Sequence, residues 1–164
     1  MIIRKDHLDD DQGTENRAER YGAFELLRYS QAGALTQFGA YVETLQPGSR
    51  ASERHWHEEE DEFLFVLSGE ATVIEEDGAH ALQPGDAACW PARTANGHQV
   101  LNRSNAPCSY LIVGTRAARD VVHYPDSQQI LYNEGDKWRL LRTDGTLLKS
   151  GGFSYDSGST LDDA

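Results

Sequence analysis

Short stretches in which hydrophobic and polar residues alternate fill the middle of the chain, and turn residues separate them. The clearest separators are Ser68-Gly69, Asp77-Gly78 and Pro84-Gly85. Alternation with a period of two is typical of half-buried strands, and glycine, proline and aspartate are residues that tight turns require. No stretch between these turns shows a convincing helical period. The pattern therefore predicts an all-β fold, an antiparallel barrel or sandwich.

The expected strands follow one another closely. The Asp77-Gly78 pair predicts a hairpin, because both central residues of a type I′ turn need a positive φ, and the segments 71–74 and 79–82 would pair across it. A second hairpin is expected over 135–149, with Asp144-Gly145 as its turn. The other expected strands are 35–45, 87–90, 98–102, 109–113 and 120–124.

The length of 164 residues fits one domain with a core of its own. Residues 1–31 are mixed and charged and predict an N-terminal arm, irregular except for a short strand or turn at its apolar cluster, 23–27. Residues 32–149 form the expected barrel with a C-terminal extension. Residues 150–164 are rich in Gly, Ser and Asp, which predicts a tail without fixed structure.

Charge and composition narrow the classes of partner. A formal net charge of −12 argues against nucleic acid and anionic membrane surfaces, which both need a basic footprint. No apolar run approaches the roughly 18 residues of a membrane helix, and the N-terminus lacks a signal-peptide core. Cys89 and Cys108 are too few for a disulfide framework. A reduced, cytoplasmic protein with a small-molecule ligand is the simplest interpretation.

Two histidines, a glutamate and a third histidine are the candidate site. His55 and His57 point to the same side of an extended strand, so both imidazoles can approach one ion. Glu62 opens the apolar run 63–67 and can bring a carboxylate beside them, and His98 is a further candidate downstream. Three imidazoles and one carboxylate suit a divalent Zn, Fe, Mn, Ni or Co ion, and the ligand set alone does not select among these.

The surroundings of Glu62 leave an alternative open. The residues just before it are all acidic, so Asp61 is the carboxylate if the loop is one residue tighter. Glu62 is preferred, because Leu64 and Val66 then share its face and continue an apolar barrel lining. The plainer interpretation of the whole set is exposed strand residues that happen to fit the spacing.

These residues resemble the two motifs of the cupin superfamily, the small double-stranded β-helix or jelly-roll barrels. The first motif reads Gly, a spacer, His-x-His, three or four residues, Glu, six residues, Gly. The second reads Gly, five residues, Pro-x-Gly-x-x-His, three residues, Asn. The chain supplies Gly48, His55, His57, Glu62 and Gly69 for the first motif, and Gly85, Pro91, His98 and Asn102 for the second.

The second motif is not matched in full. Arg93 stands where the family has glycine, and two extra residues separate Pro91 from His98, which changes the local loop more than the ligand role. The segments 114–116 and 122–126 also resemble single-domain bacterial cupins whose activity is not established. The resemblance implies a single-domain jelly roll that holds one divalent metal ion (Zn, Fe, Mn or Ni) at His55, His57, Glu62 and His98.

The resemblance also implies a function and an assembly. A metal-dependent oxygenase, isomerase or lyase acting on a small oxygen-bearing metabolite is one expectation. The alternative is a non-catalytic cupin that binds a small ligand or uses the metal only as a structural staple. Cupins commonly dimerise through sheet edges, so a homodimer is expected, with the cluster Phe24, Leu26 and Leu27 as a candidate contact.

Three residues are candidate substrate contacts. Arg93 could hold a carboxylate or phosphate through its forked guanidinium, although a solvated loop arginine is the alternative. Tyr41 and Trp90 could line the mouth of the pocket, with core packing as the alternative. For Asn102 we expect a side-chain amide that ties a loop and does not touch the ligand.

Overall fold

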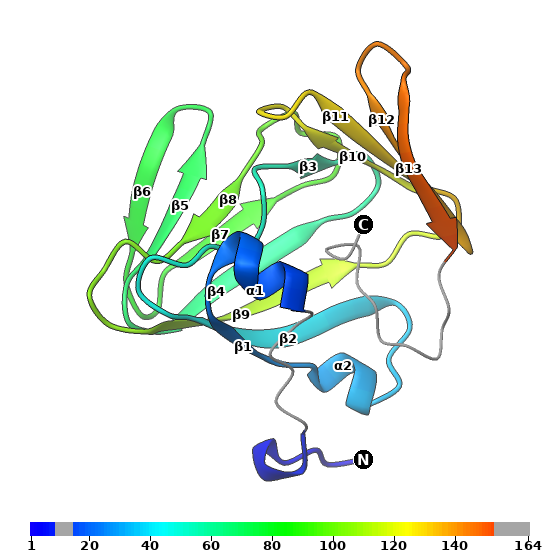
Figure 1. Cartoon of the computed structure of the whole chain (residues 1–164). Helices are drawn as coiled ribbons and strands as arrows, with labels where there is room; N and C mark the ends of the chain where they lie inside the picture. The colour runs from blue at the N-terminus through cyan, green and yellow to red at the C-terminus, as the bar shows by residue number, and fades with distance from the viewer. Residues whose placement is uncertain (9–14, 153–164) are drawn as a thin grey trace.

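The computed structural model describes residues 1–8 and 15–152, and antiparallel strands make up most of it (Figure 1). Three short helical elements lie in the N-terminal part: η1 (Lys5–His7), α1 (Glu15–Tyr21) and α2 (Tyr29–Ala32). The strands are β1 (Phe24–Leu27), β2 (Phe38–Leu45), β3 (Trp56–His57), β4 (Glu62–Ser68), β5 (Ala71–Glu75), β6 (Gly78–Leu82), β7 (Ala87–Trp90), β8 (Gln99–Leu101), β9 (Cys108–Thr115), β10 (Asp120–Tyr124), β11 (Gln129–Asn133), β12 (Lys137–Arg142) and β13 (Leu147–Gly152).

The strands form three sheets. A five-stranded sheet has the order β1-β2-β9-β4-β7, a second has the order β13-β12-β11-β10-β3, and a three-stranded sheet has the order β6-β5-β8. In Figure 1 the long strands β2, β4 and β9 run side by side, with the β10–β13 sheet and the β5, β6 and β8 sheet beyond them. The expected all-β, single-domain jelly roll is confirmed. None of the described helices is long and apolar enough to span a membrane.

The core lies between the β1-β2-β9-β4-β7 sheet and the β6-β5-β8 sheet. Along β4, Leu64 and Val66 are fully buried, whereas Phe63 and Leu67 are exposed. Leu64 lies opposite Ile112 of β9, and Val66 lies opposite the buried Tyr110. Burial of each large apolar side chain contributes roughly 1.5–3 kcal/mol. The alternation that predicts β4 therefore also decides which of its side chains, Glu62 included, face the barrel interior.

The N-terminal arm contributes a strand to the barrel. β1 pairs antiparallel with β2, with Phe24 opposite Leu45. Phe24 and Leu26 are only 2% exposed and belong to the hydrophobic core. The expected short strand is therefore confirmed, but Phe24 and Leu26 pack inside their own subunit and are not available to contact a partner. The homodimer itself stays a prediction.

The β5–β6 hairpin forms as expected, but its turn is displaced by one residue. Glu75 lies opposite Gly78, so the turn consists of Glu76 and Asp77. Gly78 has a φ of 136°, whereas Asp77 is not among the residues with positive φ. The expected type I′ turn centred on Asp77-Gly78 is wrong: glycine supplies the positive φ at the start of β6, after the turn.

The C-terminal extension is longer than expected. The second predicted hairpin corresponds to β12 and β13, and Gly145 in its turn has a φ of 88°. β13 continues to Gly152, so the first residues of the expected tail are part of a strand. The rest of that tail, 153–164, lies outside the described residues. β11 was not expected from the sequence, whereas β7 and β10 have the predicted bounds.

Asn102 ties the loop before β9 to the end of β2. Its buried side chain donates to the carbonyl oxygens of Leu45 at 2.9 Å and Ala106 at 2.8 Å. Its Oδ1 accepts from the backbone N–H of Ser104 at 3.0 Å and from the Ser104 hydroxyl at 2.8 Å. Asn102 is not among the residues that line the cavity described below, in agreement with the structural role expected for it.

Replacing Asn102 by alanine should lower the free energy of unfolding by about 2–4 kcal/mol, because several buried hydrogen-bonding groups lose their partner. Urea denaturation of the purified variant measures this. Asn96→Ala is the matched control: Asn96 accepts one exposed hydrogen bond, from the Glu76 backbone, and its loss should cost less than about 1 kcal/mol. Equal losses in the two variants would contradict the role given to Asn102.

Candidate metal centre

A direct cross-strand pair brings His55 and His98 together. The backbone N–H of His55 donates to the His98 carbonyl at 3.0 Å, and the His98 N–H donates to the His55 carbonyl at 2.8 Å. Residues opposite each other in an antiparallel pair carry their side chains on the same face, and the two rings lie with their centroids 4.8 Å apart. Residues 43 positions apart in sequence thus form one wall of the site.

His57 joins this pair from β3. It lies opposite Val122 of β10, and the centroids of the His55 and His57 rings are 5.1 Å apart. Trp56, between the two histidines, faces the other way and stacks on His123 with a centroid distance of 4.0 Å. The His-x-His alternation expected from the sequence therefore holds.

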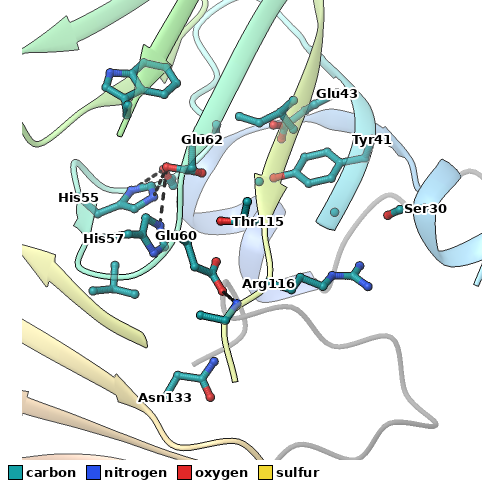
Figure 2. A pocket seen from close by; sticks show the side chains of 18 of the residues that line it. Ser30, Tyr41, Glu43, His55, His57, Glu60, Glu62, Thr115, Arg116 and Asn133 are labelled. Carbon is teal, nitrogen blue, oxygen red and sulfur yellow. Dashed lines mark hydrogen bonds and ion pairs between the residues drawn. The ribbon is translucent and has the colours of Figure 1, made fainter. Parts of the chain in front are cut away.

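Glu62, the first residue of β4, completes the cluster (Figure 2). Its Oε2 lies 2.7 Å from Nε2 of His98, 3.6 Å from Nε2 of His57 and 3.8 Å from Nε2 of His55. Asp61, the alternative carboxylate, accepts instead from the backbone N–H of Ala92 at 2.8 Å and is exposed. The structure thus brings together the four side chains singled out from the sequence, and it favours Glu62 over Asp61.

Burial and opposite charge act against each other in this cluster. Burial alone would raise the pKa of Glu62, but the close contact with His98 and the charges of the three imidazoles hold that pKa well below its usual range. Burial lowers the pKa of His55 to about 4, against the opposing pull of Glu62. The site therefore combines an ionised carboxylate with at least one neutral imidazole.

Asp120 belongs to the candidate site, although the sequence alone did not single it out. Its Oδ2 lies 2.6 Å from Nδ1 of His57, and its Oδ1 accepts from the backbone N–H of Glu59 at 2.9 Å. Burial would lower the pKa of His57, but the hydrogen bond to Asp120 and the neighbouring carboxylates outweigh it and raise the pKa to about 8. The sequence places Asp120 at the start of the predicted strand 120–124, but no spacing rule links Asp120 to His57.

The outward nitrogens of the rings show which way the imidazoles are oriented. Nδ1 of His55 lies 2.8 Å from the Glu53 carbonyl oxygen, and Nδ1 of His57 faces Asp120. Both acceptors favour a proton on Nδ1, which leaves the Nε2 lone pairs directed at the centre of the cluster. The ring of His98 is fixed by stacking on Trp90 at a centroid distance of 3.8 Å.

A metal ion fits this donor set. Oε2 of Glu62 is buried and makes no well-aligned hydrogen bond within the described part of the chain, although three imidazole nitrogens surround it. Buried polar atoms are normally satisfied, and acceptors that converge on one point need a cation there. The group His55, Glu62 and His98 could hold a metal ion, and so could the group His57, Glu60 and Asp120.

The cluster opens into a cavity of about 960 Å³. Tyr41 and Trp90, two of the expected substrate contacts, line it. Arg93 does not: its side chain is 72% exposed and pairs with Glu59 at 2.7 Å. Arg93 has a φ of 67°, so the position that is glycine in the family motif keeps a left-handed backbone while its side chain points to the surface.

The cavity wall also contains polar groups that the sequence did not reveal. Oε1 of Glu43 accepts from Nη2 of Arg17 at 2.8 Å, and Oε2 accepts from the Tyr110 hydroxyl at 2.7 Å. Burial and the Glu43 charge raise the pKa of Tyr110 well above its ordinary value. Glu60 accepts from the backbone N–H of Ala117 at 2.8 Å, and burial raises its pKa to about 6. For Glu43 the sequence does carry a signal: it is the one acidic residue in the strand predicted over 35–45.

The His57–Asp120 pair predicts a pH dependence for the metal-free protein. Unfolding returns His57 to its ordinary pKa of 6.5, so its folded value of about 8 corresponds to about 2 kcal/mol of stability. This contribution is fully present below pH 6.5 and is lost as the pH rises through 8. In Asp120→Asn, the loss of stability between these pH values should shrink, as followed by urea denaturation at each pH. The same loss in both proteins would contradict the assignment.

Comparisons of the sequence and of the fold with known proteins identify a family. The family model of the cupin domain matches residues 41–114, which contain the four converging side chains. Among solved structures, a sugar phosphate isomerase of the cupin superfamily from Silicibacter pomeroyi DSS-3 is 34% identical, covers 91% of this chain and 97% of that chain, and has a TM-score of 0.84. A candidate sugar phosphate isomerase from Acidithiobacillus ferrooxidans is 30% identical over 77% of this chain and 81% of that chain, with a TM-score of 0.70.

More distant structures share only the fold. A predicted oxalate decarboxylase from Thermotoga maritima is 20% identical over 71% of this chain and 100% of that chain, with a TM-score of 0.58. No curated protein matches the sequence. The likeness to the Silicibacter protein, which extends along nearly the whole length of both chains, decides the family: this chain belongs to the cupin superfamily.

Proposed function

We propose that this protein is a metal-dependent isomerase that acts on a small phosphorylated sugar. The observation that carries the proposal is the convergence of three Nε2 atoms and one carboxylate oxygen, within 3.8 Å, at the wall of a cavity large enough for a metabolite. Oxygenase and lyase chemistry were equally open from the sequence. Isomerisation is preferred because the Silicibacter and Acidithiobacillus structures, which are 34% and 30% identical to this chain, are named for it.

His55, His57, Glu62 and His98 would hold one divalent ion such as Zn, Fe, Mn or Ni. When bound, the ion supplies Lewis-acid polarisation of a substrate carbonyl or hydroxyl oxygen. Four protein ligands leave room for substrate on a six-coordinate ion. The Glu53 carbonyl and Asp120 keep the rings of His55 and His57 oriented, a role that outer partners of ligating histidines commonly have.

Isomerisation of an aldose to a ketose moves a hydrogen between neighbouring carbon atoms, so the site needs a group that accepts and returns a proton. Glu60 has the position for this role. It lines the cavity beside His57, one of its oxygens is fixed by the Ala117 N–H, and no other hydrogen bond to it is present within the described residues. Tyr41, Glu43 and Tyr110 offer polar contacts for sugar hydroxyls on the same cavity wall.

Substitution of His57 tests the metal centre. Protein purified without added metal should contain close to one divalent ion per chain, and His57→Ala should lose most of it, as measured by elemental analysis. His123→Ala is the matched control, because His123 lies on β10 opposite Trp56 and pairs with Glu58 outside the cluster. Equal metal content in the two variants, or none in the unsubstituted protein after reconstitution, would rule the centre out.

Substitution of Glu60 tests the reaction. The metal-loaded protein should interconvert aldose and ketose phosphates in an NMR assay, and Glu60→Gln should lower kcat by about 100-fold or more without loss of metal. Glu59→Gln is the control, because Glu59 pairs with Arg93 at the surface. Absence of turnover on a panel of such sugars, in every metal form, would refute the isomerase proposal.

A purely structural metal is the second candidate, and one observation favours it: four protein ligands are enough to close a tetrahedral zinc site. In that case chelation would lower the unfolding temperature strongly, and no small molecule would bind in the cavity. The polar wall around Glu43 supports the catalytic alternative, since a metal staple does not require it.

A further inference from the structure

The cavity is lined by positively charged side chains that the metal centre does not explain. Three arginines line it, Arg17, Arg28 and Arg116, in a chain whose formal net charge is −12. Arg17 is buried and pairs with Glu43 at 2.8 Å, so its charge is already compensated. Arg28 and Arg116 lie in the segments that follow β1 and β9.

Arg116 is held in place by its backbone and by one side-chain hydrogen bond. Its backbone N–H donates to the Gln37 carbonyl at 3.1 Å, and Nη1 donates to the Leu35 carbonyl at 2.8 Å. The guanidinium packs against Gly39: a Cβ at that position would lie 3.8 Å from both Nε and Nη2 of Arg116, at ordinary van der Waals distance. The group is therefore oriented over β2 by contacts that use only part of its hydrogen-bonding capacity.

The remaining donors of Arg116 have no carboxylate partner within the described part of the chain. No ion pair involves this residue, and Nε and Nη2 make no hydrogen bond there. In Figure 2, Arg116 and Ser30 lie on one side of the pocket, and His55 and His57 lie on the other. A guanidinium with open donors recognises an anion with two or three coplanar or tetrahedral oxygens, and phosphate fits it in bidentate fashion.

We propose that Arg116 binds the phosphate group of the substrate. The opposite, oxygen-bearing end of the molecule then reaches the His55, His57, Glu62 and His98 cluster. Placing the other end of the substrate at the metal cluster rests on the proposed isomerase function, whereas the anion site at Arg116 does not. Binding at both ends would fix the reacting carbons beside Glu60, which lies between the two groups in Figure 2.

Phosphate binding to single variants tests the anion site. Isothermal titration of inorganic phosphate into the metal-loaded protein should give a Kd that rises at least tenfold in Arg116→Gln and less in Arg116→Lys. Arg119→Gln is the matched control, because Arg119 is exposed, lies three residues further along and does not line the cavity. Unfolding temperatures within a few degrees of the unsubstituted protein show that the variants are folded.

Phosphate held by the metal would give a different result. Its affinity would fall in His57→Ala and stay unchanged in Arg116→Gln, and that outcome overturns the proposal. Absence of phosphate binding to the unsubstituted protein overturns it as well.

Kinetics separate this inference from the proposed function. With an active enzyme, Arg116→Gln should raise KM for a sugar phosphate at least tenfold, change kcat less than threefold, and leave the constants for the unphosphorylated sugar unchanged. Turnover that is insensitive to Arg116 contradicts the anion site and leaves the isomerase standing. Phosphate binding that depends on Arg116, without any turnover, contradicts the isomerase and leaves the anion site standing.

Discussion

A buried carboxylate among three imidazoles is the constraint on which this structure depends. Placing an ionised Glu62 inside the barrel is costly unless positive charge compensates it, and its Oε2 lies within 3.8 Å of all three Nε2 atoms. Without metal, protons must supply that charge: the hydrogen bond to Asp120, together with Glu62, raises the pKa of His57 to about 8, whereas burial lowers that of His55 to about 4. A divalent ion would satisfy all four groups together, and the neutral form of each imidazole would then be the useful one.

The rest of the cavity is arranged around that centre. One wall carries hydroxyl and carboxylate groups that are already tied to each other, such as Tyr110 and Glu43. A second side carries arginine, and Arg116 is oriented there by the Leu35 carbonyl. Glu60 lies beside the cluster, with one oxygen fixed by the backbone of Ala117. A ligand that suits all of these features is small, rich in oxygen and anionic at one end.

Local pattern was enough to predict an antiparallel barrel or sandwich and to single out the four converging residues, and the cupin motifs narrowed the fold to a jelly roll. The period of two placed Glu62 on the same face as Leu64 and Val66, and the family motifs supplied His98. Contacts between segments that are far apart in sequence could not be predicted from local pattern. Asp120 contacts His57 only because β10 pairs with β3, and Arg17 of α1 binds Glu43 of β2. Backbone geometry explains why two further predictions, the turn at Asp77-Gly78 and the substrate contact of Arg93, differ from the structure. Gly78 supplies its positive φ outside the turn, and Arg93 adopts a left-handed backbone that directs its side chain away from the cavity.

X-ray absorption at the edge of the bound metal will show whether three imidazoles and one carboxylate bind a single ion. We expect imidazole scattering from about three histidines, with nitrogen and oxygen ligands at roughly 2.0–2.2 Å and no sulfur. A spectrum that contains sulfur ligands, or oxygen ligands without imidazole, would contradict it.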